Sequence, residues 1–371
     1  MNVSVIIPCY NEEAFVGQAI GSLLEQSRPP NEIIFVDDGS EDRSVEIARS
    51  FGEAVTVLPG RKGGAARARN YGVDYASGDA LMFFDADDVL GVRSMEHLIA
   101  HLERHPDGVV ACPWFHLDKA DSRWVRRPPS CAPLRNDQDY LSGWLTEWYH
   151  PPCSVLWSRA AYESIEGWDP KAFVNDDGDL MMRALVDGVR LSITDHGEAF
   201  YRRLPQEQQA GSLSGARVTH AGRTSEIYVL RKIAQRLEKK GMLDAYRKPL
   251  TWALERLRRL CRDPYPDLSD VCIELMKRYG EPWYLRTGRR INRKLRDTGG
   301  RAVNRTRRLL TDLGMTGTRR LLGRVKNGFL ATGDRSKVMS SGADGQHTDE
   351  EITIGLSAYR EVSNNGGRDK L

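Results

Sequence analysis

Short apolar runs alternate with amphipathic segments along the first part of the chain. The apolar runs are typical of buried strands, and they lie at residues 3–8, 32–37, 54–58 and 80–84. Segments with apolar side chains at helical spacing lie between them, at residues 15–24, 44–51 and 65–76. Strands that alternate with helices at this spacing predict a parallel sheet with helices on both faces. We therefore expect an α/β, Rossmann-like fold with a mostly parallel sheet.

The pattern is less regular after a fifth predicted strand at residues 109–114. Residues 118–135 are polar and contain proline, so we expect an irregular excursion there rather than a regular crossover. Further helices are predicted at residues 137–148, 159–165 and 180–186, and further strands at residues 154–157, 190–194 and 199–202. The sheet-based domain is thus expected to span residues 1–213.

Helical spacing continues from residue 224 to residue 279 and predicts a second, helical module. We assign residues 214–330 to this module, which is basic toward its C-terminal end. Residues 331–371 are rich in Gly, Ser, Asp and Asn, and we expect a disordered tail there.

The composition is that of a globular protein, with 40% hydrophobic and 28% charged residues in 371. No apolar run approaches the ~20 residues that a membrane-spanning helix needs. The six cysteines have no CxxC spacing, and we expect them to be reduced. The chain opens on a strand without a basic and apolar leader, so we expect a cytoplasmic protein.

Three carboxylates follow the predicted strand at residues 80–84, namely Asp85, Asp87 and Asp88. Ligands of open α/β sheets bind beyond the carboxyl ends of the strands. Carboxylates there are suited to a hard cation such as Mg²⁺ or Mn²⁺ held together with substrate phosphates. The alternative is that Asp85 or Asp88 caps the helix expected near residues 93–105.

Other predicted strands end on small or polar residues at the same edge of the sheet: Pro8 to Asn11, Asp37 to Ser40, and Gly63-Gly64. An aromatic ring such as Tyr10 can cover a base, an aspartate can accept hydrogen bonds from it, and glycines let the backbone approach a ligand. Taken singly, each stretch is also compatible with an ordinary turn. In this order they indicate a nucleotide site.

Four stretches of these residues resemble the family 2 glycosyltransferases: VSVIIPCYNEE at 3–13, VDDGS at 36–40, ARNYG at 68–72 and FDADD at 84–88. The resemblance covers about residues 1–213. It implies the GT-A fold, a nucleotide-diphosphate sugar donor, a divalent cation (Mg²⁺ or Mn²⁺) and inversion at the anomeric carbon.

The resemblance also implies roles for single residues of the donor site. Tyr10 and Asp38 would contact the nucleobase, with Pro8 and Glu12 nearby, and Arg69 would serve phosphate positioning or packing.

The metal site is implied in the same way. Asp85 and Asp87 match the family's DXD motif, with Asp87 as the direct metal ligand and Asp85 also close to the sugar nucleotide. Asp88 would share in metal binding.

A second acidic cluster, Asn175 to Leu180, resembles the family's Glu-Asp-x-Asp-Leu motif. The resemblance makes Asp177 the catalytic base and Asp176 its neighbour, whereas Asp179 is expected to serve structure. The alternative is that these acids cap the helix that follows. One departure from the family is Leu204, where many relatives carry a histidine for which His196 or His220 could substitute.

Recognition of the acceptor is expected between residues 114 and 168, where six of the eight tryptophans lie. His150 and Trp168 are candidates from this region for contact with the acceptor, with weaker support than the donor-site residues. Most of the tryptophans are expected in the core.

The segment 281–330 carries 14 Lys and Arg residues against three acids, although the formal net charge of the chain is +3. It could lie on an anionic membrane surface, which would place the protein peripherally at the inner face of the membrane. It could equally be a solvated helical face. Nucleic-acid binding is disfavoured, because no binding motif accompanies the charge.

The sequence thus predicts an inverting, metal-dependent glycosyltransferase of cell-envelope polysaccharide biosynthesis, with a glycan, lipid-linked or protein hydroxyl as acceptor. The alternative is a non-catalytic protein that binds a nucleotide sugar or a glycan. A nucleotidyltransferase is disfavoured, because no glycine-rich, arginine-containing loop follows the first strand.

Overall fold

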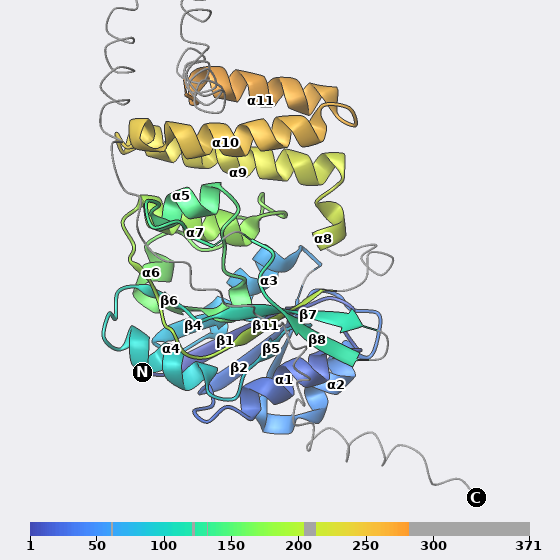
Figure 1. Cartoon of the computed structure of the whole chain (residues 1–371). Helices are drawn as coiled ribbons and strands as arrows, with labels where there is room; N and C mark the ends of the chain where they lie inside the picture. Colours follow the sequence, from blue (N-terminus) through green and yellow to red (C-terminus); the bar gives the residue numbers. More distant parts are fainter. Residues whose placement is uncertain (61, 121–122, 132, 204–212, 282–371) are drawn as a thin grey trace, which may run out of the picture. The chain divides into compact units, whose positions relative to one another are not determined.

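The computed structural model of the protein describes residues 1–60, 62–120, 123–131, 133–203 and 213–281. Within these residues the main sheet has seven strands in the order β10-β6-β9-β4-β1-β2-β3 (Figure 1). The strands are β1 (Val3–Cys9), β2 (Glu32–Asp37), β3 (Thr56–Pro59), β4 (Ala80–Phe83), β6 (Val109–Ala111), β9 (Val155–Ser158) and β10 (Leu191–Ile193). Strand β9 is antiparallel to its neighbours β4 and β6, and the other pairs of this sheet are parallel.

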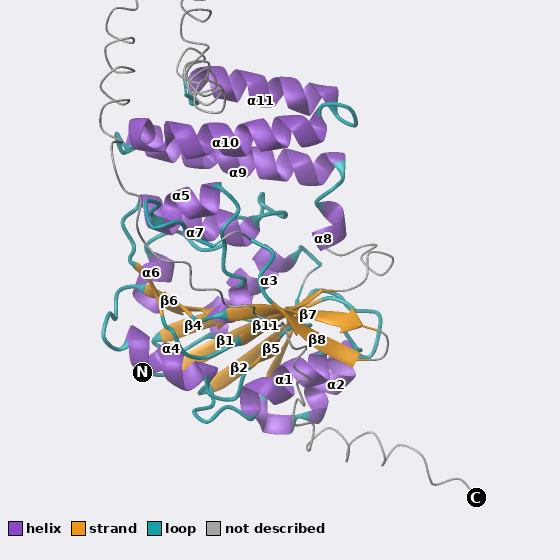
Figure 2. Cartoon of the chain, viewed as in Figure 1, coloured by secondary structure: helices purple, strands orange, loops and turns teal. Residues whose placement is uncertain are grey.

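Helices cover both faces of this sheet (Figure 2). One face carries α1 (Val16–Leu24), α2 (Ser44–Ser50) and α4 (Ser94–Leu102), and the other carries α3 (Ala65–Tyr75), α6 (Arg159–Glu163) and α7 (Asp176–Val186). Ile6 of β1 lies in the core with α3 and α7, whereas Val5 and Ile7 lie in the core with α1 and α4. Because both faces are buried, the strand reads as one continuous apolar run.

A smaller sheet has the order β5-β11-β7-β8, with β5 (Val89–Leu90), β7 (Trp114–Ala120), β8 (Arg123–Arg127) and β11 (Ala199–Arg203). The expectation of an irregular excursion at 118–135 was therefore wrong for the end of β7 and for β8. The polar residues of β8 obscured the strand, because an edge strand with half-exposed side chains needs few apolar positions.

The remaining elements are the short helices η1 (Gly52–Ala54), α5 (Tyr140–Leu145), η2 (Pro152–Ser154) and α8 (Leu213–Ala216), followed by three long helices. These are α9 (His220–Lys239), α10 (Leu243–Cys261) and α11 (Pro266–Arg278). Their buried side chains, such as Ile233 and Leu254, continue the core that lies between the sheet and α7. Residues 1–280 belong to one compact unit.

The predicted class is confirmed: an α/β fold with a mostly parallel sheet, helices on both faces and a helical region after it. The boundary at residue 213 stays a prediction. The basic segment and the tail fall on residues 282–371, outside the described part of the chain. Among the described helices, none combines the length and apolar character needed to cross a membrane.

Gly72 sets the close approach of α3 to the sheet. A Cβ atom at this position would come within 2.5 Å of Ile6 Cγ2 and 3.1 Å of Val36 Cγ2. Both neighbours lie on fully packed strands, so there is little room for them to move. The glycine thereby fixes the height of α3 above β1 and β2.

We expect Gly72→Ala to lower the free energy of unfolding by about 1–2 kcal/mol, because forced repacking costs about 1–3 kcal/mol and the gain in helix propensity returns up to about 1 kcal/mol. The matched control is Gly21→Ala in α1, where a Cβ atom would meet nothing within 4 Å. It should raise stability by about 0.5–1 kcal/mol. Denaturant unfolding measures both, and equal stability of the two variants would contradict the packing argument.

Candidate active site

The acidic loop after β4 lies at the carboxyl edge of the sheet. The Asp85 side chain is 27% exposed and Asp87 is half-buried. Burial raises the pKa of Asp87 to about 7, and the charge of Asp85 adds to this shift. The two carboxylates are therefore close enough to repel each other, which is the arrangement that a bound cation would relieve.

Asp88 differs from Asp85 and Asp87 in its burial. Its side chain is fully buried, and Oδ1 accepts a 2.9 Å hydrogen bond from the backbone N–H of Arg202 in β11. This burial and this bond favour a structural role for Asp88, whereas its share in metal binding stays a prediction. Neither Asp85 nor Asp88 caps α4, because that helix begins after Arg93 without a side-chain cap.

Arg69, on α3, joins the two acidic clusters. Its Nη2 lies 2.6 Å from Asp85 Oδ1 and its Nη1 lies 2.7 Å from Asp176 Oδ2. The side chain is 3% exposed. Burial lowers the pKa of Arg69, but the charges of the two carboxylates outweigh this effect and raise it. The guanidinium therefore stays charged and fixes the end of β4 to the first turn of α7.

The Trp168 ring packs against this guanidinium. The ring lies 4.2 Å from Arg69 Cζ and packs edge-on against Phe83. Asn70 holds the Trp168 backbone with a 2.8 Å bond from Nδ2 to the carbonyl and a 3.0 Å bond from the N–H to Oδ1. Trp168 is 3% exposed, so its expected contact with an acceptor is not supported, and we assign it to the support of Arg69.

Asp177 lies beside Asp176 in the first turn of α7. The turn begins at Asn175, which has a left-handed φ of 61°. Asp177 Oδ1 accepts a 2.8 Å bond from the Gly178 N–H. Burial raises the pKa of Asp177 to about 6, and the neighbouring charge of Asp176 adds to the shift. This carboxylate is ionised at neutral pH yet basic enough to accept a proton.

The predicted nucleobase residues lie at the ends of β1 and β2. Tyr10 is 41% exposed, with Lys62 Nζ 5.1 Å from its ring centroid. Asp38 accepts bonds of 2.7 and 2.8 Å from the N–H groups of Gly63 and Gly64. Asp38 therefore shapes the glycine loop, a role that the sequence did not suggest.

Glu12 lies near the acidic loop that follows β4, whereas Pro8 is part of β1. Burial raises the pKa of Glu12 to about 8, and the charges of Asp87 and Asp85 add to this. Glu12 therefore faces the acidic loop of β4. Pro8 is buried within β1, opposite Val36.

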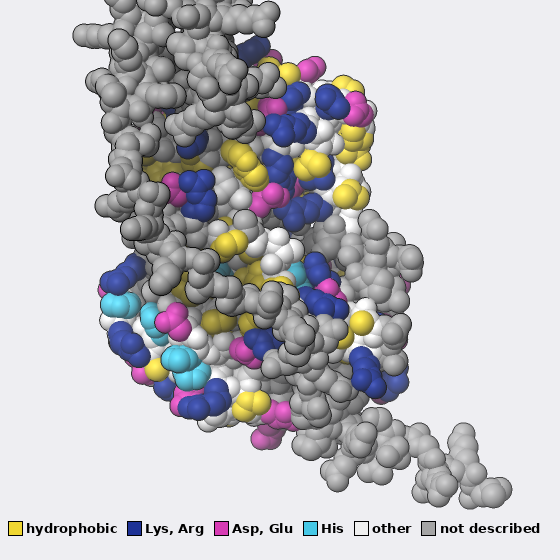
Figure 3. All heavy atoms as spheres, in the orientation of Figure 1, with side chains coloured by type: hydrophobic (Ala, Val, Ile, Leu, Met, Phe, Trp, Pro, Cys, Tyr) yellow, Lys and Arg dark blue, Asp and Glu magenta, His cyan; other side chains and the backbone are white. Residues whose placement is uncertain are grey.

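The predicted histidines are engaged elsewhere. His150 is 7% exposed, with Nδ1 3.3 Å from Ser154 Oγ, and burial lowers its pKa to about 4. This burial argues against its expected contact with an acceptor. His196 packs against His97 of α4, with ring centroids 5.2 Å apart. Figure 3 shows histidine side chains gathered on this part of the surface. His220 Nε2 lies 2.9 Å from Asp267.

Two residues near Asp177 were missed from the sequence. Burial raises the pKa of Tyr149, and the charge of Asp177 contributes to the shift. Burial lowers the pKa of Arg217, but the charge of Glu226, whose Oε1 lies 3.1 Å from Arg217 Nε, outweighs this effect and raises it, and the charge of Asp177 adds to the rise. Arg217 lies beyond the end of the predicted catalytic domain, so no motif of that domain indicated it.

The residues present fit a cation that is held partly by substrate. The described residues include no group of three or more His, Cys, Asp or Glu side chains arranged to hold a metal. Asp85 and Asp87 nevertheless offer two neighbouring carboxylates, and Mg²⁺ is usually held by one or two carboxylates together with substrate phosphates. The donor set thus suits a metal that binds with a diphosphate.

We expect Arg69→Ala to lower the free energy of unfolding by about 3–5 kcal/mol, because it leaves Asp85 and Asp176 without their buried partner. Arg67→Ala is the matched control, since Arg67 is exposed on the same helix, and it should change stability by less than about 0.5 kcal/mol. Denaturant unfolding compares them. Equal stability of the two variants would show that the bridge contributes little.

Comparison with known proteins identifies the N-terminal region. Residues 4–165 match the sequence model described as Glycosyl transferase family 2. The chain is 28% identical over 218 residues to the uncharacterized glycosyltransferase EpsJ of Bacillus subtilis, covering 55% of this chain and 61% of that protein. It is 33% identical over 126 residues to glycosyltransferase GlyG of Streptococcus pneumoniae, covering 33% and 42%.

A solved structure is also similar, the complex of Staphylococcus aureus TarS 1-349 with UDP-GlcNAc. The TM-score is 0.48 at 17% identity, over 76% of this chain and 93% of that one. The chain itself spans about half the length of the curated relatives it matches, 61% of EpsJ and 42% of GlyG. The part of the chain that is similar to glycosyl transferase family 2 is thus residues 4–165.

Proposed function

We propose that the protein is an inverting, metal-dependent glycosyltransferase that moves a sugar from a nucleotide-diphosphate sugar to an acceptor hydroxyl. The observation that carries the proposal is the Arg69 bridge, with 2.6 Å to Asp85 and 2.7 Å to Asp176. It brings together the acidic loop implied in donor binding and the acidic turn implied in catalysis. These segments are far apart in the sequence, and a shared site explains why both are acidic.

In this proposal Asp177 is the general base. A single displacement with inversion needs a base that takes the proton of the acceptor hydroxyl as that oxygen attacks the anomeric carbon. A pKa of about 6 keeps Asp177 ionised at neutral pH and still able to hold a proton. Asp176 is already paired with Arg69, so its role is to hold the turn and to raise the basicity of its neighbour.

Asp85 and Asp87 would hold the cation together with the donor diphosphate. When bound, the cation supplies positive charge that stabilises the departing nucleoside diphosphate. Glu12, which faces the same loop, would then lie near the bound diphosphate. Tyr10 offers an exposed ring to the base of the nucleotide, and the loop fixed by Asp38 borders the same place.

The acceptor is proposed to be a hydroxyl of a cell-envelope glycan, a lipid-linked glycan or a protein. The names of the curated relatives support a glycosyltransferase. A cytoplasmic location, with peripheral attachment to the inner face of the membrane through residues 281–330, stays part of the proposal.

The first test is Asp177→Asn. Transfer should fall by about 10²–10⁴-fold, the usual contribution of general base catalysis. The affinity for the nucleoside diphosphate in the presence of Mn²⁺, measured by calorimetry, should remain close to that of the wild type, because Asp177 is not expected to contact the nucleotide. Asp195→Asn serves as a control at an exposed carboxylate. Turnover of the Asp177 variant at the wild-type rate would remove Asp177 as the base.

The pH dependence follows from the same group. The active form of the base is ionised, so kcat/KM for the acceptor should be constant above the pKa of Asp177 and fall as pH drops through about 6. Below that value the decrease should approach tenfold per pH unit. The measurement needs saturating Mn²⁺ so that protonation of Asp87 does not limit the rate. A rate that stays constant down to pH 4.5 would rule out a base with this pKa.

A further inference from the structure

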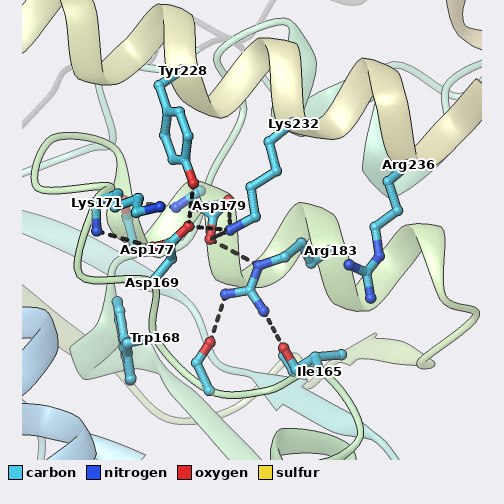
Figure 4. A network of polar contacts seen from close by, with 12 residues as sticks. Ile165, Trp168, Asp169, Lys171, Asp177, Asp179, Arg183, Tyr228, Lys232 and Arg236 are labelled. Carbon is cyan, nitrogen blue, oxygen red and sulfur yellow. Dashed lines mark hydrogen bonds and ion pairs between the residues drawn. The ribbon is translucent and has the colours of Figure 1, made fainter.

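Helix α9 contributes two side chains to a pair of aspartates beside the candidate active site (Figure 4). Lys232 Nζ lies 2.6 Å from Asp169 Oδ2 and 3.0 Å from Asp179 Oδ2. The Tyr228 hydroxyl donates a 2.8 Å hydrogen bond to Asp169 Oδ2. One ammonium group therefore serves two carboxylates from two different segments.

These groups are withdrawn from solvent. Asp179 is fully buried, and the side chains of Asp169 and Lys232 are 17% and 24% exposed. Buried carboxylates are costly unless they are paired. Asp179 also accepts a 2.8 Å bond from Arg183 Nε, one turn later on α7. The pair is thus held from α7 and from α9 at the same time.

The two aspartates belong to the segments that carry the site. Asp169 directly follows Trp168, whose ring supports the Arg69 guanidinium. Asp179 lies in the same first turn of α7 as Asp177. Arg183 extends the connection, because its Nη2 donates a 2.6 Å bond to the Gly167 carbonyl and its Nη1 donates to the Ile165 carbonyl.

We propose that Lys232 is a positioning residue for the reaction: by holding Asp169 and Asp179 together, it fixes the turn of Asp177 relative to the Trp168–Arg69 support. This inference rests on the proposed function for its catalytic consequence. Lys232 does not touch the reacting groups, and it acts through the two segments that it joins. It lies on α9, beyond residues 4–165, so the helical region would be part of the catalytic apparatus.

The same helix offers a matched control. Arg236, one turn further along α9, pairs with Asp187 at the C-terminal end of α7, with Nε 3.0 Å from Oδ1. Lys232→Met and Arg236→Met each remove an ion pair between α9 and α7, but at opposite ends of α7. A merely structural role predicts the same behaviour for both variants.

We expect Lys232→Met to lower kcat by about 10- to 100-fold with little change in the KM of the donor, since small displacements of a catalytic group cost up to about 10²-fold. Arg236→Met should keep the wild-type kcat. Lys232→Arg should restore most of the rate, because it returns a cation to both carboxylates. Amide hydrogen exchange of residues 165–179 should be faster in Lys232→Met than in Arg236→Met.

Equal kcat values and equal exchange of residues 165–179 in the two methionine variants would overturn the inference while leaving the proposed function intact. Absence of transfer by the wild-type protein with any nucleotide sugar would instead count against the proposed function, and the exchange data would still decide whether Lys232 holds this turn. If Lys232→Met does not fold, Tyr228→Phe replaces it, because it removes one donor to Asp169. Tyr228→Phe should lower kcat by less than the 10- to 100-fold expected for Lys232→Met, and amide exchange of residues 165–179 should be faster than in Arg236→Met. The same kcat and the same exchange as in Arg236→Met would overturn the inference.

Discussion

The Arg69 guanidinium is the interaction on which the rest of the site depends. Two carboxylates from distant segments, Asp85 and Asp176, meet on one buried cation at 2.6 and 2.7 Å. Such an arrangement is tolerable only when each charge has its partner, because an uncompensated buried charge costs several kcal/mol. The bridge therefore specifies a distance between the end of β4 and the first turn of α7.

A series of contacts holds the guanidinium at that point. Gly72 lets α3 lie close to β1 and β2, which sets the height of Arg69 above the sheet edge. The Trp168 ring packs against the guanidinium, and Asn70 fixes the backbone of Trp168 through a hydrogen bond. Lys232 of α9 then holds the next residue of that loop, Asp169. The helices after the sheet domain thus contribute to the geometry of the acidic edge, in agreement with their place in the same compact unit as residues 1–213.

Much of this could be predicted from the sequence, for identifiable reasons. Strands buried on both faces, such as β1, read as uninterrupted apolar runs. The rule that ligands lie at carboxyl strand ends selected Asp85, Asp87 and Asp88, but it could not show that Asp88 is fully buried. The edge strand β8 could not be recognised in the same way, because half-exposed strands carry polar residues. The sequence also could not predict the contacts of individual side chains. Trp168 was a weak acceptor candidate, and only its tertiary contacts reveal that it packs against Arg69.

The number of donors on Arg69 explains how neighbouring aspartates can differ in chemistry. Its two Nη groups each meet one carboxylate, Asp85 and Asp176, and this leaves Asp177 with the Gly178 N–H as its close donor. Burial raises the pKa of Asp176, and the charge of Arg69 opposes this rise, because a cation in direct contact stabilises the ionised form of a carboxylate. Asp177 has burial and the charge of Asp176 beside it instead, and its pKa rises to about 6. Burial therefore raises the pKa of both aspartates, and Arg69 opposes that rise through direct contact at Asp176 but only through its more distant charge at Asp177. This difference would be lost if Arg69 were centred on Asp177.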